Sequence, residues 1–322
     1  MTEVRAVVID GFDDVPHLAA FPLPELAADQ VLIQVQAASV NAFDWKAAAG
    51  RFKDTFDYQF PVTIGRDYAG LVTAVGDAVR RVAPGDEVFG YISGQALHRG
   101  AFATHVWAGE NECFVRRPAG LDAVSAACLP LAGVVAMRCI AAVVPVPGER
   151  VLVLGAPGGV GSLAVQLAAG AGAHVIASGR ADDETYLREL GAADVIEPGS
   201  GLIGAVRKRY PDGIDGLIDL VHYREDFLAH ARTLVRGGRA ASVHRAADEA
   251  VMASRGLHGT NVASFPDRVL LEQLGGLAVS GRLRAVVTAR YGLEQAPAAL
   301  EDARTRHTRG KLVIDVENSS SR

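Results

Sequence analysis

The sequence lacks the features that mark several specialised classes of protein. Its three cysteines (Cys113, Cys128 and Cys139) are too few and too scattered for a disulfide scaffold or a four-thiolate zinc site, so we expect buried core thiols. No apolar run reaches the length of a membrane-spanning helix. The net charge is −5 and the basic residues are dispersed, which predicts neither a nucleic-acid surface nor membrane attachment.

The first residues, MTEVRAVVID, contain no basic leader and no apolar segment of the secretory type, so we expect a cytoplasmic protein. Aromatic residues make up only 6% of the chain, whereas glycine occurs 35 times and hydrophobic residues reach 49%. This composition favours an α/β protein with closely packed layers. A length of 322 residues favours two domains rather than one.

The most informative stretch is a glycine-rich turn between an apolar strand and a helix. Val151–Leu154 is continuously apolar, as a strand buried on both faces should be, and Gly155, Gly158, Gly159 and Gly161 follow it. A helix then begins near Val160, and a second apolar strand follows. Glycine lets the backbone approach a ligand closely, and free amides at a helix N-terminus bind a pyrophosphate. The order strand, glycine turn, helix, strand therefore predicts a dinucleotide site.

The end of the second strand bears on which dinucleotide binds. An NAD site usually has Asp or Glu there to bind the ribose 2′-OH, whereas NADP sites carry small polar and basic residues. Ser178 and Arg180 occupy this place and could bind a 2′-phosphate, which favours NADPH. The alternative is NADH, with Arg180 solvated and Asp182 or Asp183 turned toward the ribose.

Hydrophobic periodicity divides the chain into a β-rich part and a part of alternating strands and helices. The expected strands of the β-rich part are Arg5–Ile9, Val31–Gln36, Gly70–Val75, Glu87–Tyr91 and Gly100–Trp107. The expected elements of the alternating part include the strands Val151–Leu154, His174–Ala177, Asp194–Ile196, Ile214–Val221, Ala240–His244 and Leu257–Ser264, and the helices Asp183–Leu190 and Asp226–Val235. This alternation predicts a doubly wound parallel sheet.

Several long motifs, in one order along nearly the whole chain, resemble the zinc-independent quinone oxidoreductase branch of the medium-chain dehydrogenase/reductases. They are Ala38–Asn41 with Asp44, Phe60–Asp67 with Gly70, Val82–Gly90, Ala126–Ala136, Gly155–Ser162 and Gly310–Val313. The resemblance implies a barrel-like GroES-like catalytic domain interrupted by a Rossmann domain, with NADPH as cofactor and usually a homodimer. We place the catalytic domain at residues 1–122 and 266–322 and the Rossmann domain at 123–265.

The resemblance also implies which residues hold the cofactor and which chemistry is excluded. The cofactor-binding residues expected by this comparison are Gly155, Pro157, Gly158, Gly159, Val160, Ser178, Arg180, Val221, Ser242 and Lys311. Zinc-dependent members carry Cys where Asn41 stands and His where Arg66 stands, and a cysteine lobe that this chain lacks. We therefore expect no metal ligand set and no stoichiometric zinc.

Hydride transfer without a metal requires a group that stabilises the negative charge developing on the acceptor. Asn41 and Lys46 are the candidate catalytic residues, since the barrel domain of the family presents this region to the nicotinamide. The chain departs from the family nearby, because Lys46 stands where many relatives have Tyr. Substrate identity therefore stays open. The alternatives are reduction of a quinone or activated C=C bond, reduction of an enone or enoyl thioester in biosynthesis, and NADPH binding in a structural or sensing role.

Overall fold

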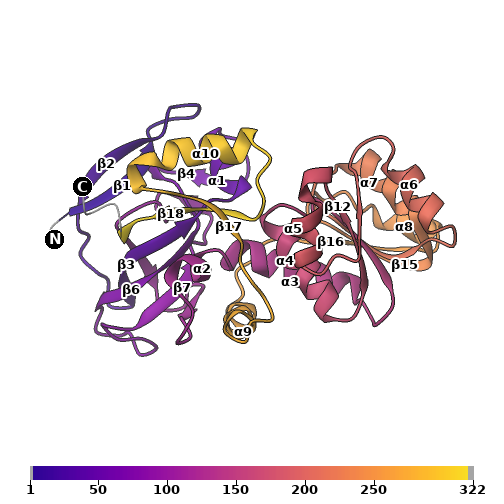
Figure 1. Ribbon diagram of the computed structural model, residues 1–322. Helices are drawn as coiled ribbons and strands as arrows, with labels where there is room; N and C mark the ends of the chain where they lie inside the picture. Colours follow the sequence, from indigo (N-terminus) through magenta and orange to yellow (C-terminus); the bar gives the residue numbers. More distant parts are fainter. Residues whose placement is uncertain (1–2, 318–322) are drawn as a thin grey trace. The chain divides into compact units, whose positions relative to one another are not determined.

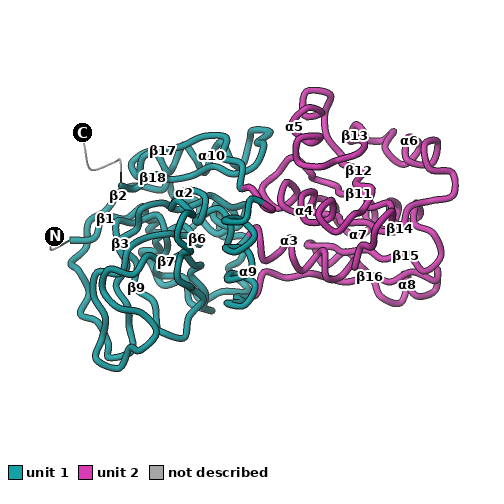
Figure 2. The backbone as a smooth tube through the Cα atoms, turned by 60° about the horizontal axis from the view of Figure 1, so that its bottom comes forward, with its two compact units in different colours: residues 1–131, 266–281, 285–322 teal, residues 132–265, 282–284 magenta. Residues whose placement is uncertain are grey.

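A computed structural model describes residues 3–317, which form two compact units (Figure 2). The first unit combines the chain up to Leu131 with Pro266–Gly281 and the residues from Ala285 onward. The second comprises Ala132–Phe265 and Arg282–Arg284. Among the described residues, no helix has both the length and the apolar character needed to cross a bilayer.

The first unit is built on a mixed sheet with strand order β10-β7-β6-β3-β18-β17, and β9 also pairs with β3. A second sheet has the order β2-β1-β5, and β4 pairs with β8. Figure 1 shows α10 beside α1 and β18, against which it packs. The elements are β1 (Glu3–Ile9), β2 (His17–Pro22), β3 (Gln30–Ser39), α1 (Ala42–Ala48), β4 (Asp57–Tyr58), β5 (Val62–Thr63), β6 (Asp67–Val75), β7 (Glu87–Tyr91), β8 (Ala96–Leu97), β9 (His105–Gly109), β10 (Phe114–Arg116), α2 (Ala123–Ala127), α9 (Arg268–Val279), β17 (Val287–Tyr291), α10 (Ala296–Thr305) and β18 (Lys311–Asp315).

The second unit contains a parallel sheet of six strands with the order β13-β12-β11-β14-β15-β16. Its apolar strands are buried along almost their whole length, as strands covered by helices on both faces must be. The elements are α3 (Pro130–Val143), β11 (Arg150–Leu154), α4 (Gly159–Gly170), β12 (His174–Ser178), α5 (Glu184–Glu189), β13 (Asp194–Ile196), α6 (Leu202–Arg209), β14 (Ile214–Asp219), α7 (Arg224–His230), β15 (Leu234–Ser242), α8 (Glu249–Ser254) and β16 (His258–Asn261).

The first unit extends to Leu131, beyond the boundary at residue 122 that the sequence suggests. The reason is α2, which begins at the cap Asp122, whose side chain accepts a hydrogen bond from the backbone amide of Ser125. This helix packs against β3, β6 and β7 and so belongs to the first unit. All three cysteines are buried, as expected.

Several expected elements begin or end elsewhere in the structure; the strand expected over Ala240–His244, for example, spans Leu234–Ser242. The helix expected over Asp226–Val235 ends at His230, because Leu234 begins strand β15 and pairs with Ile214. The strand expected over Gly100–Trp107 is regular only from His105 onward. At Gly100, before this strand begins, the backbone packs closely against Thr63. A Cβ on Gly100 would stand 2.3 Å from the Thr63 carbonyl oxygen. Sequence periodicity thus locates these elements but not their ends.

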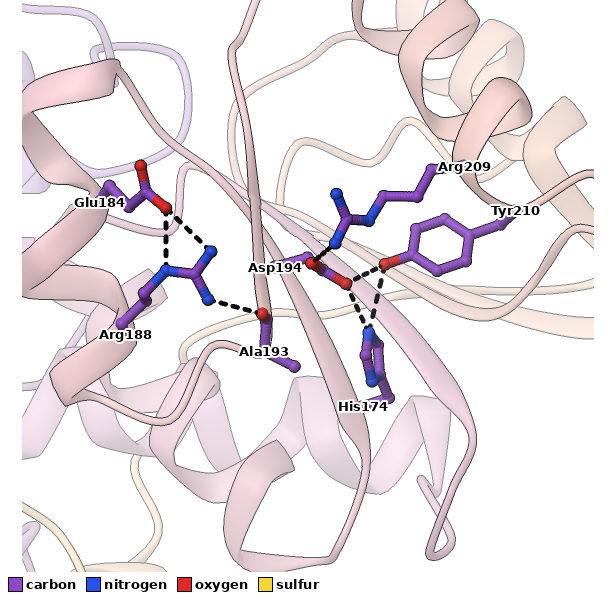
Figure 3. A network of polar contacts seen from close by, with 7 residues as sticks. All are labelled: His174, Glu184, Arg188, Ala193, Asp194, Arg209 and Tyr210. Atoms are coloured by element: carbon purple, nitrogen blue, oxygen red, sulfur yellow. Dashed lines mark hydrogen bonds and ion pairs between the residues drawn. The ribbon is translucent and has the colours of Figure 1, made fainter.

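A polar network connects β12 and β13, the two outermost strands on one side of the parallel sheet (Figure 3). The carboxylate of Asp194 accepts hydrogen bonds from Arg209 and Tyr210, and His174 Nε2 lies 2.7 Å from its Oδ2. Arg188 binds Glu184 and donates to the carbonyl oxygen of Ala193 at 2.8 Å. The network fixes the end of α6, a helix that the sequence analysis did not predict, to the sheet.

Candidate functional site

The parallel sheet reverses its order of winding between β11 and β14. From β11 the chain proceeds outward through β12 to β13, and it then returns to β14 and proceeds the other way through β15 to β16. Leu154, the last residue of β11, pairs with Asp219, the last residue of β14. Ligands of open α/β sheets bind at the carboxyl ends of the strands at such a point. The glycine turn begins there, since Gly155 follows Leu154.

The glycines of this turn are required by close packing and by an unusual backbone conformation. Gly155 has a φ of +79°, which side chains other than glycine rarely adopt. A Cβ on Gly161 would stand 2.1 Å from the Gly155 carbonyl oxygen, so α4 lies tightly against the turn. Gly158 caps α4 without a side chain. A Cβ there would meet only the Gly155 oxygen, at 3.5 Å, among heavy atoms of the described residues.

This geometry fits a dinucleotide pyrophosphate. The N-terminal end of α4, a helix of 12 residues, carries partial positive charge and amide donors. Gly159 and Val160 form its first turn, and Pro157 precedes the cap. A Cβ on Gly158 would occupy the space beside these donors.

Ser178 and Arg180 lie where β12 ends, as the sequence predicts. Ser178 is buried at the strand terminus, and the Arg180 side chain is exposed. Asp183, one of the two acidic residues of the NADH alternative, is fully buried, and its Oδ2 accepts a hydrogen bond from the Arg180 backbone amide at 2.9 Å. That carboxylate is thus engaged in shaping the loop.

The other two expected cofactor residues of this unit differ in their surroundings. Val221 is exposed, and its Cγ2 would lie 2.7 Å from a Cβ on Gly155, so it borders the turn. Ser242 is fully buried at the end of β15, and its Oγ accepts hydrogen bonds from the amides of His244 and Ala246, both at 3.2 Å. Val221 is therefore available at the surface of the turn, while Ser242 shapes the adjacent loop.

Asn41 and Lys311 belong to a buried polar cluster in the first unit. The Lys311 ammonium donates to Asn41 Oδ1 at 2.5 Å and to the Val40 carbonyl oxygen at 3.0 Å, and it lies 3.9 Å from Asp67 Oδ2. Asn41 Nδ2 donates to the same Asp67 oxygen at 2.9 Å. Both ends of the Asn41 amide are thus engaged within the protein. Lys311, expected by resemblance to contact the cofactor, finds its partners in this cluster.

Two carboxyl groups anchor this cluster to the fold. Asp67 also accepts hydrogen bonds from Ser39 at 3.1 Å and from the amide of Leu131 at 3.1 Å, so it has a structural role. Burial raises the pKa of Asp67, and Lys311 opposes that rise. Burial raises the pKa of Asp44 to about 7 although its carboxylate accepts the Asn41 amide at 2.7 Å. Asn41, Asp44 and Asp67 lie in separate motifs along the sequence, and their spacing does not predict that they meet.

Arg66 fills the position at which zinc-dependent relatives carry histidine. Its side chain is buried, and Nη1 donates to the Ile92 carbonyl oxygen at 2.6 Å. The guanidinium carbon lies 4.3 Å from the ring centre of Phe43 and 5.5 Å from that of Phe56. A permanent cation held between aromatic rings is incompatible with a metal ligand at this residue.

Lys46 lies apart from the buried cluster, on the half-buried side of α1. Its Nζ stands 5.5 Å from the ring centre of Trp45, and burial lowers its pKa. Its ammonium is therefore partly desolvated, the kind of group that can stabilise an anion or give up a proton. A separate cavity of about 340 Å³ in this unit is lined by residues that include Phe21, His98 and Trp107, and neither Asn41 nor Lys46 borders it.

Comparisons with known proteins agree with this architecture. Residues 27–119 match the family model described as alcohol dehydrogenase GroES-like domain, and residues 190–314 match the model described as zinc-binding dehydrogenase. The chain is 30% identical over 323 residues to the NADPH-dependent alkenal/one oxidoreductase, chloroplastic, of Arabidopsis thaliana, covering 97% of this chain and 79% of that protein.

Two further relatives carry quinone oxidoreductase in their names. The chain is 27% identical to the chloroplast envelope quinone oxidoreductase homolog of Arabidopsis thaliana, over 91% of this chain and 92% of the other. The solved structure of the quinone oxidoreductase from Coxiella burnetii superposes with a TM-score of 0.86 at 29% identity, over 98% of this chain and 99% of that one. The chain therefore belongs to the medium-chain dehydrogenase/reductase superfamily, among its quinone oxidoreductase-like oxidoreductases.

Proposed function

We propose that the protein is an NADPH-dependent oxidoreductase that reduces a quinone or an activated carbon–carbon double bond without zinc. The observation that carries the proposal is the glycine turn at the reversal point of the parallel sheet, with Ser178 and Arg180 at the end of the neighbouring strand. The names of the relatives, alkenal/one oxidoreductase and quinone oxidoreductase, support the two substrate classes. We expect a cytoplasmic homodimer that binds neither nucleic acid nor membranes.

Each part of the mechanism falls to particular residues. NADPH, when bound, supplies the hydride. The amides at the start of α4 would hold its pyrophosphate, and the Arg180 guanidinium would neutralise the 2′-phosphate. We assign to the partly desolvated ammonium of Lys46 the stabilisation of an enolate or phenolate and the supply of a proton. Asn41 is a positioning residue, since its amide is held by Asp67 and Lys311.

Replacing Arg180 with alanine should separate NADPH from NADH. Loss of a charge-assisted bond to the 2′-phosphate should weaken NADPH binding by about 1.5–3 kcal/mol and leave NADH binding almost unchanged. Fluorescence titration of both cofactors measures the difference. Arg207→Ala, which removes an exposed arginine from α6, is the control and should change neither affinity. Equal losses for both cofactors with Arg180→Ala would show that the guanidinium does not recognise the phosphate.

Turnover should survive removal of metal ions. Arg66 and the engaged amide of Asn41 cannot serve as ligands, although one matched family model is described as zinc-binding. We expect dialysis against a strong chelator to leave the rate of NADPH oxidation with the best acceptor within about 20% of its original value, since no step needs a metal. Loss of activity that added zinc restores would contradict zinc-independent chemistry.

NADPH oxidation measured with quinones, alkenals, enones and enoyl thioesters should distinguish the proposed reaction from its alternatives. A polarised double bond spreads the charge left by hydride addition, so quinones and enals should be reduced and simple ketones should not. Highest kcat/KM with enoyl thioesters would favour the biosynthetic alternative. NADPH binding without turnover on any member of the panel would favour a structural or sensing role.

A further inference from the structure

A second group of polar side chains lies at the end of β14, next to the reversal point of the sheet. Asp219 ends the strand, His222 follows three residues later, and His230 ends α7. Nδ1 of His222 stands 3.1 Å from each Asp219 carboxylate oxygen, and Nδ1 of His230 stands 3.8 Å from Oδ2. One ligand atom from each residue lies within 4.8 Å of the other two. Among residues 3–317 this is the one such group of potential metal ligands.

Burial makes this group unusual. The Asp219 side chain is fully buried, and that of His230 is 9% exposed. Within the described part of the chain, His230 Nδ1 is buried and makes no hydrogen bond of good geometry, although the backbone of Asp226 also interacts with this imidazole. A buried nitrogen without a hydrogen-bond partner lowers the stability of the fold, and a bound ion is one way to satisfy it. The His222 side chain is 29% exposed and gives the group an opening to solvent.

The network at His174 and Asp194 shows what a satisfied pair of the same residue types looks like (Figure 3). There the carboxylate binds a guanidinium and a tyrosine hydroxyl in addition to the imidazole. Asp219 instead faces two imidazoles, while its Oδ1 accepts the backbone amides of Val221 and His222 at 3.0 and 2.9 Å. Through these two hydrogen bonds the amides fix the orientation of the carboxylate, as outer-shell donors do for metal-binding carboxylates.

We propose that Asp219, His222 and His230 bind one divalent transition-metal ion of the zinc type. Two imidazoles and one carboxylate form a set of donors intermediate between hard and soft, which suits Zn²⁺ and Co²⁺. Metal–ligand bonds of about 2.0–2.2 Å at tetrahedral angles place ligand atoms roughly 3.3–3.6 Å apart. The two imidazole nitrogens stand 3.1 and 3.8 Å from Asp219 Oδ2, on either side of that range, and all three ligand atoms lie within 4.8 Å of one another. Three protein ligands leave a fourth position for water.

This site belongs to the second unit and uses neither Asn41 nor Arg66, the residues at the zinc-ligand positions of the zinc-dependent relatives. It departs from the expectation of a chain without metal ligands. The ion would join the C-terminal end of α7 to the end of β14. It would therefore stabilise the second unit, and it takes no part in the hydride transfer proposed above. The ligand spacing, Asp-x2-His-x7-His, is not a pattern from which the sequence alone would indicate a metal.

The site is tested by titrating Co²⁺ into the tag-free, chelator-treated full-length protein. We expect one ion per chain, visible d–d absorption without thiolate charge-transfer bands, and competition by Zn²⁺. His230→Gln and His222→Gln should each weaken binding by more than about 100-fold, because even outer-shell changes cost 10–100-fold. His174→Gln is the matched control, since it removes an imidazole from the other His–Asp pair and should leave the affinity unchanged.

If His230→Gln fails to fold, the variant His222→Gln tests the metal site, because His222 is partly exposed and its substitution disturbs the core less. Zn²⁺ should also raise the melting temperature of the wild type, and the His222 variant should not respond. Absence of saturable binding in the wild type would overturn the proposal. So would unchanged affinity in His222→Gln, or an equal loss in His174→Gln.

Discussion

Lys311→Met should lower the free energy of unfolding by about 3–5 kcal/mol at pH 8. Removal of the ammonium leaves the buried Asp67 carboxylate without its cation and two oxygens, Val40 O and Asn41 Oδ1, without their donor. Urea denaturation followed by circular dichroism measures the loss. The control is Lys208→Met, which removes an exposed lysine and should cost little.

The pH dependence of this variant follows from the direction of the Asp67 pKa. Burial already raises that pKa, and loss of Lys311 removes a group that lowers it. A carboxyl whose pKa is higher in the folded state contributes stability at low pH that is lost as pH rises through the folded-state pKa. The deficit of Lys311→Met should therefore be smaller at pH 5 than at pH 8. Adding Asp67→Asn should restore part of the loss, and a double variant as unstable as the single one would contradict the pairing.

Lys46→Met should lower kcat and kcat/KM together by about 10²–10³-fold while NADPH affinity stays nearly constant. The reason is that the ammonium acts on charge that develops only as the acceptor receives hydride. Steady-state kinetics with the best acceptor, together with NADPH titration, make the measurement. Lys53→Met, which removes an exposed lysine from the following turn, is the matched control. Unchanged turnover would show that Lys46 is a solvated surface lysine without a catalytic role. Backbone amides or cofactor hydroxyls would then stabilise the developing charge.

The sequence predicts the second unit better than the first for a physical reason. Strands such as β11 are buried on both faces, so their residues form continuous apolar runs between glycine turns. Helices α6 and α8 have only eight and six residues, too few for an apolar periodicity to reveal them. The end of α7 depended on Leu234, whose pairing with β14 prevents the helix from continuing.

The same distinction applies to the candidate sites. The glycine turn is local, so Gly155 and its neighbours were found from spacing alone. The cluster of Asn41, Asp67 and Lys311 joins residues 270 positions apart, and His230 reaches Asp219 only through the path of α7. Contacts of that kind depend on the tertiary fold, and no local pattern in a single sequence encodes them.

The place of β18 in the first sheet has a consequence for synthesis on the ribosome. β18 pairs with β3, and its first residue, Lys311, binds Val40, which lies 271 positions earlier. At about 5–20 residues per second, β3 and Asp67 wait on the order of 15–55 s for this partner. The second unit, whose chain is continuous from Ala132 to Phe265, emerges in between. A nascent chain therefore carries an open β-strand edge and an uncompensated acidic group throughout that interval, which makes the incomplete first unit a natural client for chaperones.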